Sequence, residues 1–205
     1  MKRAHASWVF SCASVLLSYP DEASFEADLA AVAGTLGRLP TGAARSGLEH
    51  CRQWLAGMSP LEAAATYVET FDLRRQRSLY LTYYRYGDTR DRGAVLAELA
   101  QSYRAAGFPL APGELPDFLP ALLELAAAHP RGQALLVEHK DALGSLRAEL
   151  EGAGSPYAPA VASVALALGP VGRPGKAAAR WREDGPPSER VGLGQAVPPT
   201  LVALR

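Results

Sequence analysis

Apolar residues recur at helical spacing along nearly all of the first 168 residues of this chain, and no stretch alternates convincingly between apolar and polar residues. The segment after Asp21 illustrates the pattern, with four apolar residues on one helical face: Phe25, Leu29, Val32 and Leu36. No internal repeat of fixed period is visible. The pattern predicts an all-α fold, a single-domain bundle of about eight or nine helices.

Residues that start and stop helices divide this pattern into segments. The strongest start is Ser59-Pro60-Leu61-Glu62, where proline suits the first helical position and serine and glutamate can form a capping box. Asp117 is expected to cap a helix whose first turn contains Pro120. The expected helices span about residues 6–17, 21–36, 41–56, 60–71, 78–84, 89–106, 118–128, 131–150 and 156–168.

The composition changes after residue 168. About a third of the remaining residues are glycine or proline, and a segment of this composition cannot build a hydrophobic core. We therefore expect an all-helical domain over residues 1–168 and a flexible Gly/Pro-rich tail over residues 169–205.

Charge, cysteine content and motifs narrow the function classes. The first 168 residues carry 15 basic and 18 acidic side chains, which disfavours nucleic-acid binding and mildly favours a cationic partner. Cys12 and Cys51 lack metal or disulfide spacing, the histidines lie far apart, and no catalytic motif occurs, so neither a cofactor nor an enzyme is expected. The apolar run from Trp8 to Leu17 is too short to span a bilayer and no cleavage site follows it, which predicts a cytoplasmic protein without membrane insertion.

Tyrosines are concentrated between residues 67 and 93. Three pairs lie four residues apart and are expected to share helix faces: Tyr67 with Phe71, Leu79 with Tyr83, and Tyr80 with Tyr84. Core packing accounts for any single ring, but each tyrosine hydroxyl also needs a partner or water, and a groove supplies both an apolar wall and a wet edge. The cluster therefore predicts a surface that binds an amphipathic helix of another polypeptide.

Three acids near this cluster allow two interpretations. Asp72 either pairs with a neighbouring arginine or attracts a basic partner. Asp117 either caps its helix or attracts a basic partner. Glu114 lies in a proline-rich loop, and no structural role is evident for its side chain. It is therefore a better functional candidate than Asp117. Arg90-Asp91-Arg92 is expected to serve helix-start electrostatics and intrachain ion pairing. A helical enzyme with Glu114 and Asp117 as acid and base is the alternative, and it needs both in one closed pocket.

Three segments of the chain resemble the NarJ-type nitrate reductase assembly chaperones, which belong to the wider TorD-like group. These segments are Leu17–Asp21, Tyr67–Gly93 and Glu114–Pro120. Ser155–Ala158 is also similar, and the likeness spans about residues 6–168. In the wider group the acidic loop commonly reads Glu-Pro-x-Asp-His. Glu114 and Asp117 match it, whereas Phe118 stands in place of the histidine, so a role that needs the imidazole does not carry over.

The resemblance implies a cytoplasmic chaperone that binds the N-terminal segment of the nitrate reductase α (catalytic) subunit. It holds this client competent for iron–sulfur and molybdenum cofactor insertion before membrane docking, and proteins of molybdenum cofactor biosynthesis are further implied partners. A chaperone for another molybdoenzyme of the dimethyl sulfoxide reductase type is the alternative. We expect the client helix in a groove lined by Tyr67, Phe71, Leu79, Tyr80 and Tyr83, with Asp72, Glu114 and Asp117 at its rim.

Overall fold

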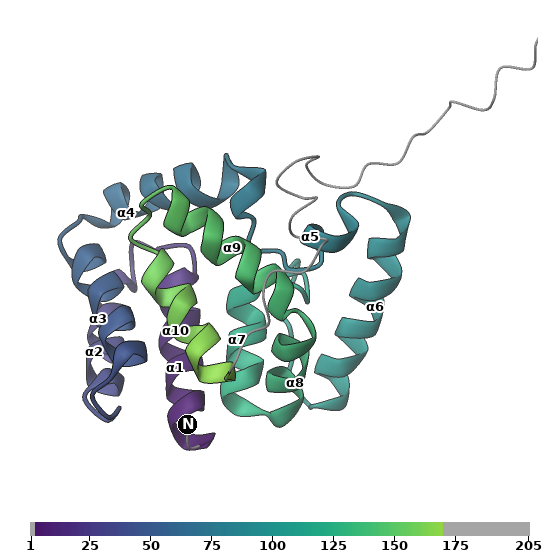
Figure 1. Ribbon diagram of the computed structural model, residues 1–205, viewed down its shortest axis with the longest axis horizontal. Coiled ribbons are helices and arrows are strands. Elements are labelled where there is room, and N and C mark those ends of the chain that lie inside the picture. Colours follow the sequence, from purple (N-terminus) through teal and green to yellow (C-terminus); the bar gives the residue numbers. More distant parts are fainter. Residues whose placement is uncertain (1–2, 170–205) are drawn as a thin grey trace, which may run out of the picture.

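The computed structural model describes residues 3–169, which form an all-helical bundle (Figure 1). Over these residues the α-helices are α1 (Arg3–Leu17), α2 (Phe25–Leu36), α3 (Ala43–Ala56), α4 (Pro60–Tyr67), α5 (Tyr83–Tyr86), α6 (Arg90–Ala105), α7 (Leu119–Ala128), α8 (Pro130–Glu138), α9 (Lys140–Gly152) and α10 (Ala158–Leu168). A π-helix, η1 (Val68–Asp72), and a short 3₁₀-helix, η2 (Arg75–Arg77), lie between α4 and α5. The all-α prediction is confirmed. The predicted tail lies outside the described residues except for Gly169.

Three helices form the centre of the bundle. The N-terminal helix α1 packs against α7 and α10, while α10 also packs against α3 and α9. In Figure 1, α2 and α3 lie at one end of the molecule and α6 at the other. In the described part of the chain, no helix has the length and apolar character that crossing a membrane requires.

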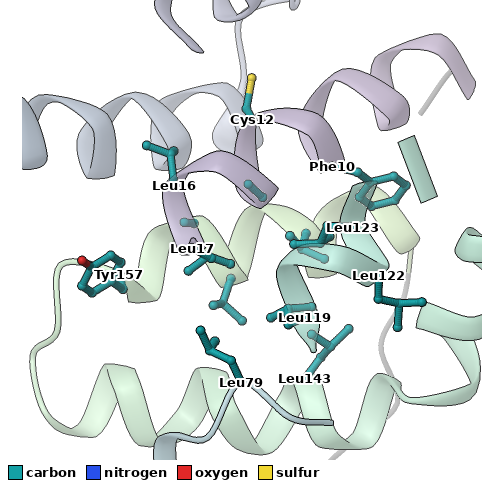
Figure 2. Packing of buried hydrophobic residues seen from close by; sticks show 14 of the residues in the cluster. Phe10, Cys12, Leu16, Leu17, Leu79, Leu119, Leu122, Leu123, Leu143 and Tyr157 are labelled. Carbon is teal, nitrogen blue, oxygen red and sulfur yellow. The ribbon is translucent and has the colours of Figure 1, made fainter. Parts of the chain in front are cut away.

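Figure 2 shows part of the core, where large side chains from α1, α7, α9 and the segment before α5 pack together. Phe10, Leu17 and Leu122 are at most 1% exposed. Burying a side chain of this size contributes about 1.5–3 kcal/mol, so the helices are stabilised chiefly by this shared interior. Burial also raises the pKa of the thiols of Cys12 and Cys51 to about 12, so both remain protonated at neutral pH.

The capping box at the start of α4 is present as predicted. The Ser59 hydroxyl accepts a hydrogen bond from the Glu62 amide, the Glu62 carboxylate accepts one from the Ser59 amide at 2.8 Å, and Pro60 is the first helical residue. The helix continues to Asp72, but its last turn widens into η1. The sequence predicted the extent of this helix to within one residue and missed the π-helical turn.

The predicted helix over residues 78–84 is wrong. Leu79 and Leu81 flank Tyr80, which forms an isolated antiparallel bridge with Phe118. The Leu81 amide donates to the Asp117 carbonyl at 3.0 Å, and the Leu119 amide donates to the Leu79 carbonyl at 2.8 Å. Only α5 is helical, so Tyr80 and Tyr84 do not share a helix face. Hydrogen bonds to a segment distant in sequence have outweighed the local helical spacing.

Two other predicted helices have different bounds. The expected helix over residues 131–150 is two helices, α8 and α9, which meet at His139, whose backbone leaves the helical conformation. The helix expected from Asp21 begins at Phe25, because the Asp21 carboxylate accepts from the amides of Ala23 and Ser24 in a turn.

Candidate functional site

A surface groove of about 670 Å³ opens beside η1 and η2. Its volume lies within the range of about 300–1,000 Å³ that is common for binding sites. We call it the aromatic groove, because six rings line it: Tyr19, Tyr67, Phe71, Tyr80, Tyr83 and Phe118. Leu79 and five charged residues complete most of its wall: Asp72, Arg75, Asp88, Arg92 and Glu114.

The floor of the groove is a chain of aromatic contacts. The rings of Tyr67 and Phe71 lie 4.9 Å apart between centroids, and Phe71 packs in turn against Tyr157 at 4.8 Å. Tyr19 meets Tyr67 edge-on at 5.4 Å. Tyr67 and Phe71 are only 4% exposed, whereas Tyr19 is 56% exposed. The two predicted rings therefore support the floor, and Tyr19 offers the larger accessible surface to a partner.

Another part of the wall comes from the segment before α5 and the loop before α7. An antiparallel bridge joins Tyr80 to Phe118, and their half-buried rings lie 5.3 Å apart. The guanidinium of Arg92, on α6, lies 5.8 Å from the Tyr80 ring and 5.7 Å from the Tyr83 ring. This cation–π arrangement holds the wall against the first turn of α6.

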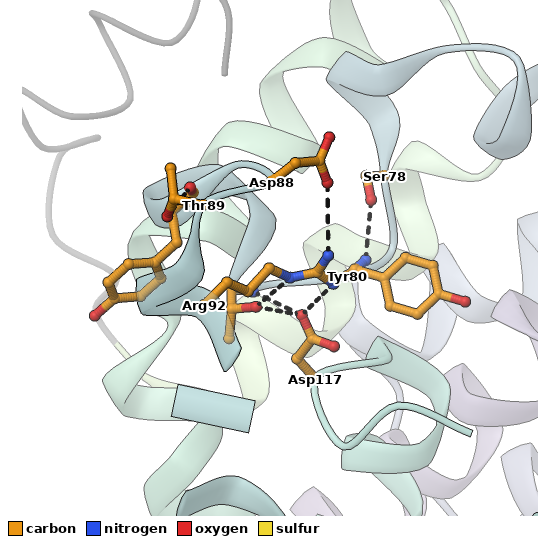
Figure 3. Close-up of polar contacts among 8 residues, drawn as sticks. Ser78, Tyr80, Asp88, Thr89, Arg92 and Asp117 are labelled. Atoms are coloured by element: carbon orange, nitrogen blue, oxygen red, sulfur yellow. Dashed lines mark hydrogen bonds and ion pairs between the residues drawn. The ribbon is translucent and has the colours of Figure 1, made fainter. Parts of the chain in front are cut away.

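Asp117 is not among the described lining residues of the groove and is not at its rim. Figure 3 shows its carboxylate facing the guanidinium of Arg92. Asp117 is fully buried, and its Oδ2 accepts from the Thr82 amide at 3.2 Å, from the Thr82 hydroxyl, and from Arg92 Nη2 at 3.1 Å. The rim assignment and the helix-cap assignment are both wrong, because α7 begins at Leu119 with no side-chain cap. A buried carboxylate requires such partners, and they tie three separate segments together.

Carboxylates dominate the rim. Asp72 and Asp88 are exposed and Glu114 is half-buried, while Arg75 is the exposed base among the described lining residues. Burial is the main cause that raises the pKa of Tyr67 and Tyr80, and both Asp72 and Glu114 raise these pKa values further. The rim therefore carries three carboxylates and, among the described lining residues, one exposed base, an excess of negative charge that favours a cationic partner.

Alkaline pH should unfold this protein at the buried tyrosines. Burial raises the pKa of Tyr67, Tyr84, Tyr103 and Tyr157 above the ordinary value of 10.0. Above pH 10 the unfolded chain then binds fewer protons at these tyrosines than the folded protein does, so their contribution to the free energy of unfolding is constant below pH 10 and falls above it. The thiols of Cys12 and Cys51, whose pKa burial raises from 9.0, add a fall that begins above pH 9.0. Tyrosinate absorbance and circular dichroism should change together; ionisation of these tyrosines near pH 10 without loss of helix would contradict the assignment.

The structure brings seven of the eight predicted site residues to one groove, with Asp117 as the exception. Sequence reasoning missed Tyr19, Asp88 and Phe118 as lining residues, although Tyr19 lies in the Leu17–Asp21 segment that carries the family resemblance. Glu114 lines the groove, whereas Asp117 is fully buried and is not among its described lining residues. The groove therefore does not hold the two acids together, which the acid–base alternative requires. The described residues include no cluster of three or more histidine, cysteine or acidic side chains suited to a metal ion.

The family model described as nitrate reductase delta subunit matches residues 39–163. The chain belongs to this family. The nitrate reductase-like protein NarX of Mycobacterium tuberculosis is 40% identical over 161 residues, covering 76% of this chain and 24% of that protein. The probable nitrate reductase molybdenum cofactor assembly chaperone NarJ of Bacillus subtilis is 39% identical over 119 residues, covering 58% of this chain and 64% of that protein.

The nitrate reductase molybdenum cofactor assembly chaperone NarJ of Escherichia coli K12 is 40% identical over 106 residues, covering 51% of this chain and 45% of that protein. The chain thus spans less than two thirds of the length of each of these three relatives. The family match and these relatives confirm the resemblance to the NarJ-type chaperones.

Proposed function

We propose that this protein is an assembly chaperone of a nitrate reductase and that its aromatic groove binds the N-terminal segment of the catalytic subunit. The bound client stays competent for iron–sulfur and molybdenum cofactor insertion, and its docking at the membrane is delayed until insertion is complete. This function places the protein in the cytoplasm, beside the proteins of molybdenum cofactor biosynthesis. The observation that carries the proposal is a groove that combines six aromatic rings with three rim carboxylates.

The chemistry of the groove suits an amphipathic helix with basic residues. Apolar side chains of the helix would pack on the rings of Tyr19, Tyr80 and Phe118, and its bases would meet the rim carboxylates. Each buried anchor contributes roughly 1.5–3 kcal/mol before ordering costs. A chaperone must release its client, so a micromolar to nanomolar affinity, about −8 to −12 kcal/mol, is the useful range. The anchors supply part of this free energy, and the remaining contacts of the bound segment must supply the rest.

The names of the relatives favour a nitrate reductase as the client over another molybdoenzyme of the dimethyl sulfoxide reductase type. Charge steers the encounter of such a client with the acidic rim more than it adds affinity. Purification of the protein from its own organism, followed by mass spectrometry of the bound proteins, distinguishes the two clients. Recovery of a different molybdoenzyme subunit would overturn the choice of client and leave the groove as the binding site.

Isothermal titration with a synthetic peptide of the client N-terminus tests the proposal. We expect a micromolar or tighter dissociation constant, and Tyr80→Ala should weaken binding at least about tenfold because an anchor surface is lost. Tyr86→Ala is the matched control, since Tyr86 is also a half-buried tyrosine of this region but does not line the groove. Absence of binding below roughly 100 μM, or equal losses in both variants, would reject the groove as the client site.

A further inference from the structure

A second pocket of about 200 Å³ adjoins the aromatic groove. Ser18 and Tyr19 line both, so the two hollows meet at the turn between α1 and α2. The Tyr19 ring is held at this border by its edge-on contact with Tyr67, yet more than half of the residue's surface is exposed. A segment that lies in the groove and continues past Tyr19 would reach the second pocket.

The second pocket has its own chemistry. Its apolar side chains come from three helices, with Val15 on α1, Leu29 on α2 and Leu55 on α3. Asp28 and Glu124 also line it, and no basic side chain is among its described lining residues. A volume of 200 Å³ is below the range of about 300–1,000 Å³ of complete small-molecule sites, so it suits a single large side chain.

One of the two acids is positioned by a neighbouring hydroxyl, because Asp28 accepts a hydrogen bond from the Ser24 hydroxyl at 2.7 Å. The Ser14 hydroxyl lies 3.4 Å from the Glu124 carboxylate but donates its proton to the nearer Pro120 carbonyl at 2.9 Å. Glu124 is exposed, so its carboxylate is accessible to a donor outside the chain. The negative charge of the groove rim therefore continues beyond Tyr19.

We infer that the client segment extends past Tyr19, places one large apolar side chain in the second pocket, and sets a basic residue beside Asp28 and Glu124. The inference rests on the proposed function and names the chemistry of its partner. The client helix then carries two separate apolar contacts, one on each side of Tyr19, joined by a positively charged face. Tyr19 contacts the middle of the bound segment.

Isothermal titration tests the inference with peptides of the client N-terminus that are shortened stepwise from each end. The long peptide contains the residue that enters the second pocket, and the shortened peptide lacks it. For the unmodified protein, loss of this residue should weaken binding at least about tenfold. Val15→Phe fills the second pocket, so this variant should bind the long peptide no more tightly than the shortened one. It should bind the shortened peptide as the unmodified protein does, which shows that its groove is intact. Val137→Phe, an exposed valine on α8, is the matched control and should bind both peptides normally.

The outcomes separate this inference from the proposed function. If neither peptide binds the unmodified protein, the proposed function fails. If both bind but Val15→Phe retains full affinity for the long peptide, the second pocket is unused and the inference alone fails. If Val15→Phe lowers the affinity for both peptides, the inference is decided by Glu124→Lys, for which Glu98→Lys on α6 is an exposed control. Selective weakening of the long peptide by Glu124→Lys upholds the inference, and equal affinities in the two lysine variants overturn it.

Discussion

Replacing Asp117 with alanine should lower the free energy of unfolding by about 3–5 kcal/mol, because it leaves the guanidinium of Arg92 and the hydroxyl of Thr82 without their buried partner. Asp117 is fully buried and Arg92 is mostly buried, so water compensates little of this loss. The substitution also removes the side-chain hydrogen bonds between Thr82 and the loop before α7, whereas the backbone hydrogen bonds between the two segments remain. Urea unfolding followed by circular dichroism measures the change.

Asp88→Ala is the matched control, because Asp88 lies 3.9 Å from the same guanidinium but its side chain is 70% exposed. An exposed pair of this kind contributes about 0–1 kcal/mol. Asp117→Asn should fall between the two alanine variants, since its amide oxygen still accepts from Thr82 but carries no charge toward Arg92. Similar small losses in Asp117→Ala and Asp88→Ala would show that the buried pair does not hold the segments together.

Gly132→Ala should destabilise the protein by about 3 kcal/mol. Gly132 lies in the first turn of α8, where the helix backbone passes directly against the end of α7. An added Cβ would lie 2.5 Å from the Leu125 carbonyl carbon and would also overlap the backbone of Ala126. Backbone atoms cannot rotate away as a side chain does, so α8 must shift from α7 and the leucines between them must repack. Thermal or urea unfolding gives the size of the effect.

Gly144→Ala on α9 is the opposite case, because no atom lies within 4 Å of the added Cβ. Alanine in a helix interior is favoured over glycine by roughly 0.5–1 kcal/mol, so this variant should be more stable than the original protein. A stabilised Gly132→Ala, or equal destabilisation of both variants, would contradict the close approach of α7 and α8.

Local signals predicted those parts of the fold that depend on neighbouring residues. The Ser59–Glu62 capping box forms within four consecutive residues, and the buried face of α2 follows from spacing alone. The pairing of Tyr67 with Phe71 across one helical turn was correct for the same reason, since both residues belong to one continuous helical stretch. Because seven predicted residues share the groove, composition and spacing also indicated much of the candidate site.

Long-range contacts decided the rest. Residues 78–84 have helical spacing, yet Leu79 and Leu81 exchange backbone hydrogen bonds with residues 117–119, which no local pattern reveals. Asp117 has the position of a helix cap in the sequence, but Arg92 reaches it from α6 and makes burial of the carboxylate possible. Tyr19 joins the groove because the turn after α1 lies beside Tyr67 at the end of α4.

The chain alone therefore specified an all-α architecture, most of its helices and an aromatic, acidic segment suited to binding a polypeptide. Its tertiary structure assigned each side chain to the floor, the rim or the support of the groove. The physical reason is that helical spacing and capping depend on residues a few positions apart. Burial of a charge, or exposure of a ring, depends instead on which distant segments pack beside it.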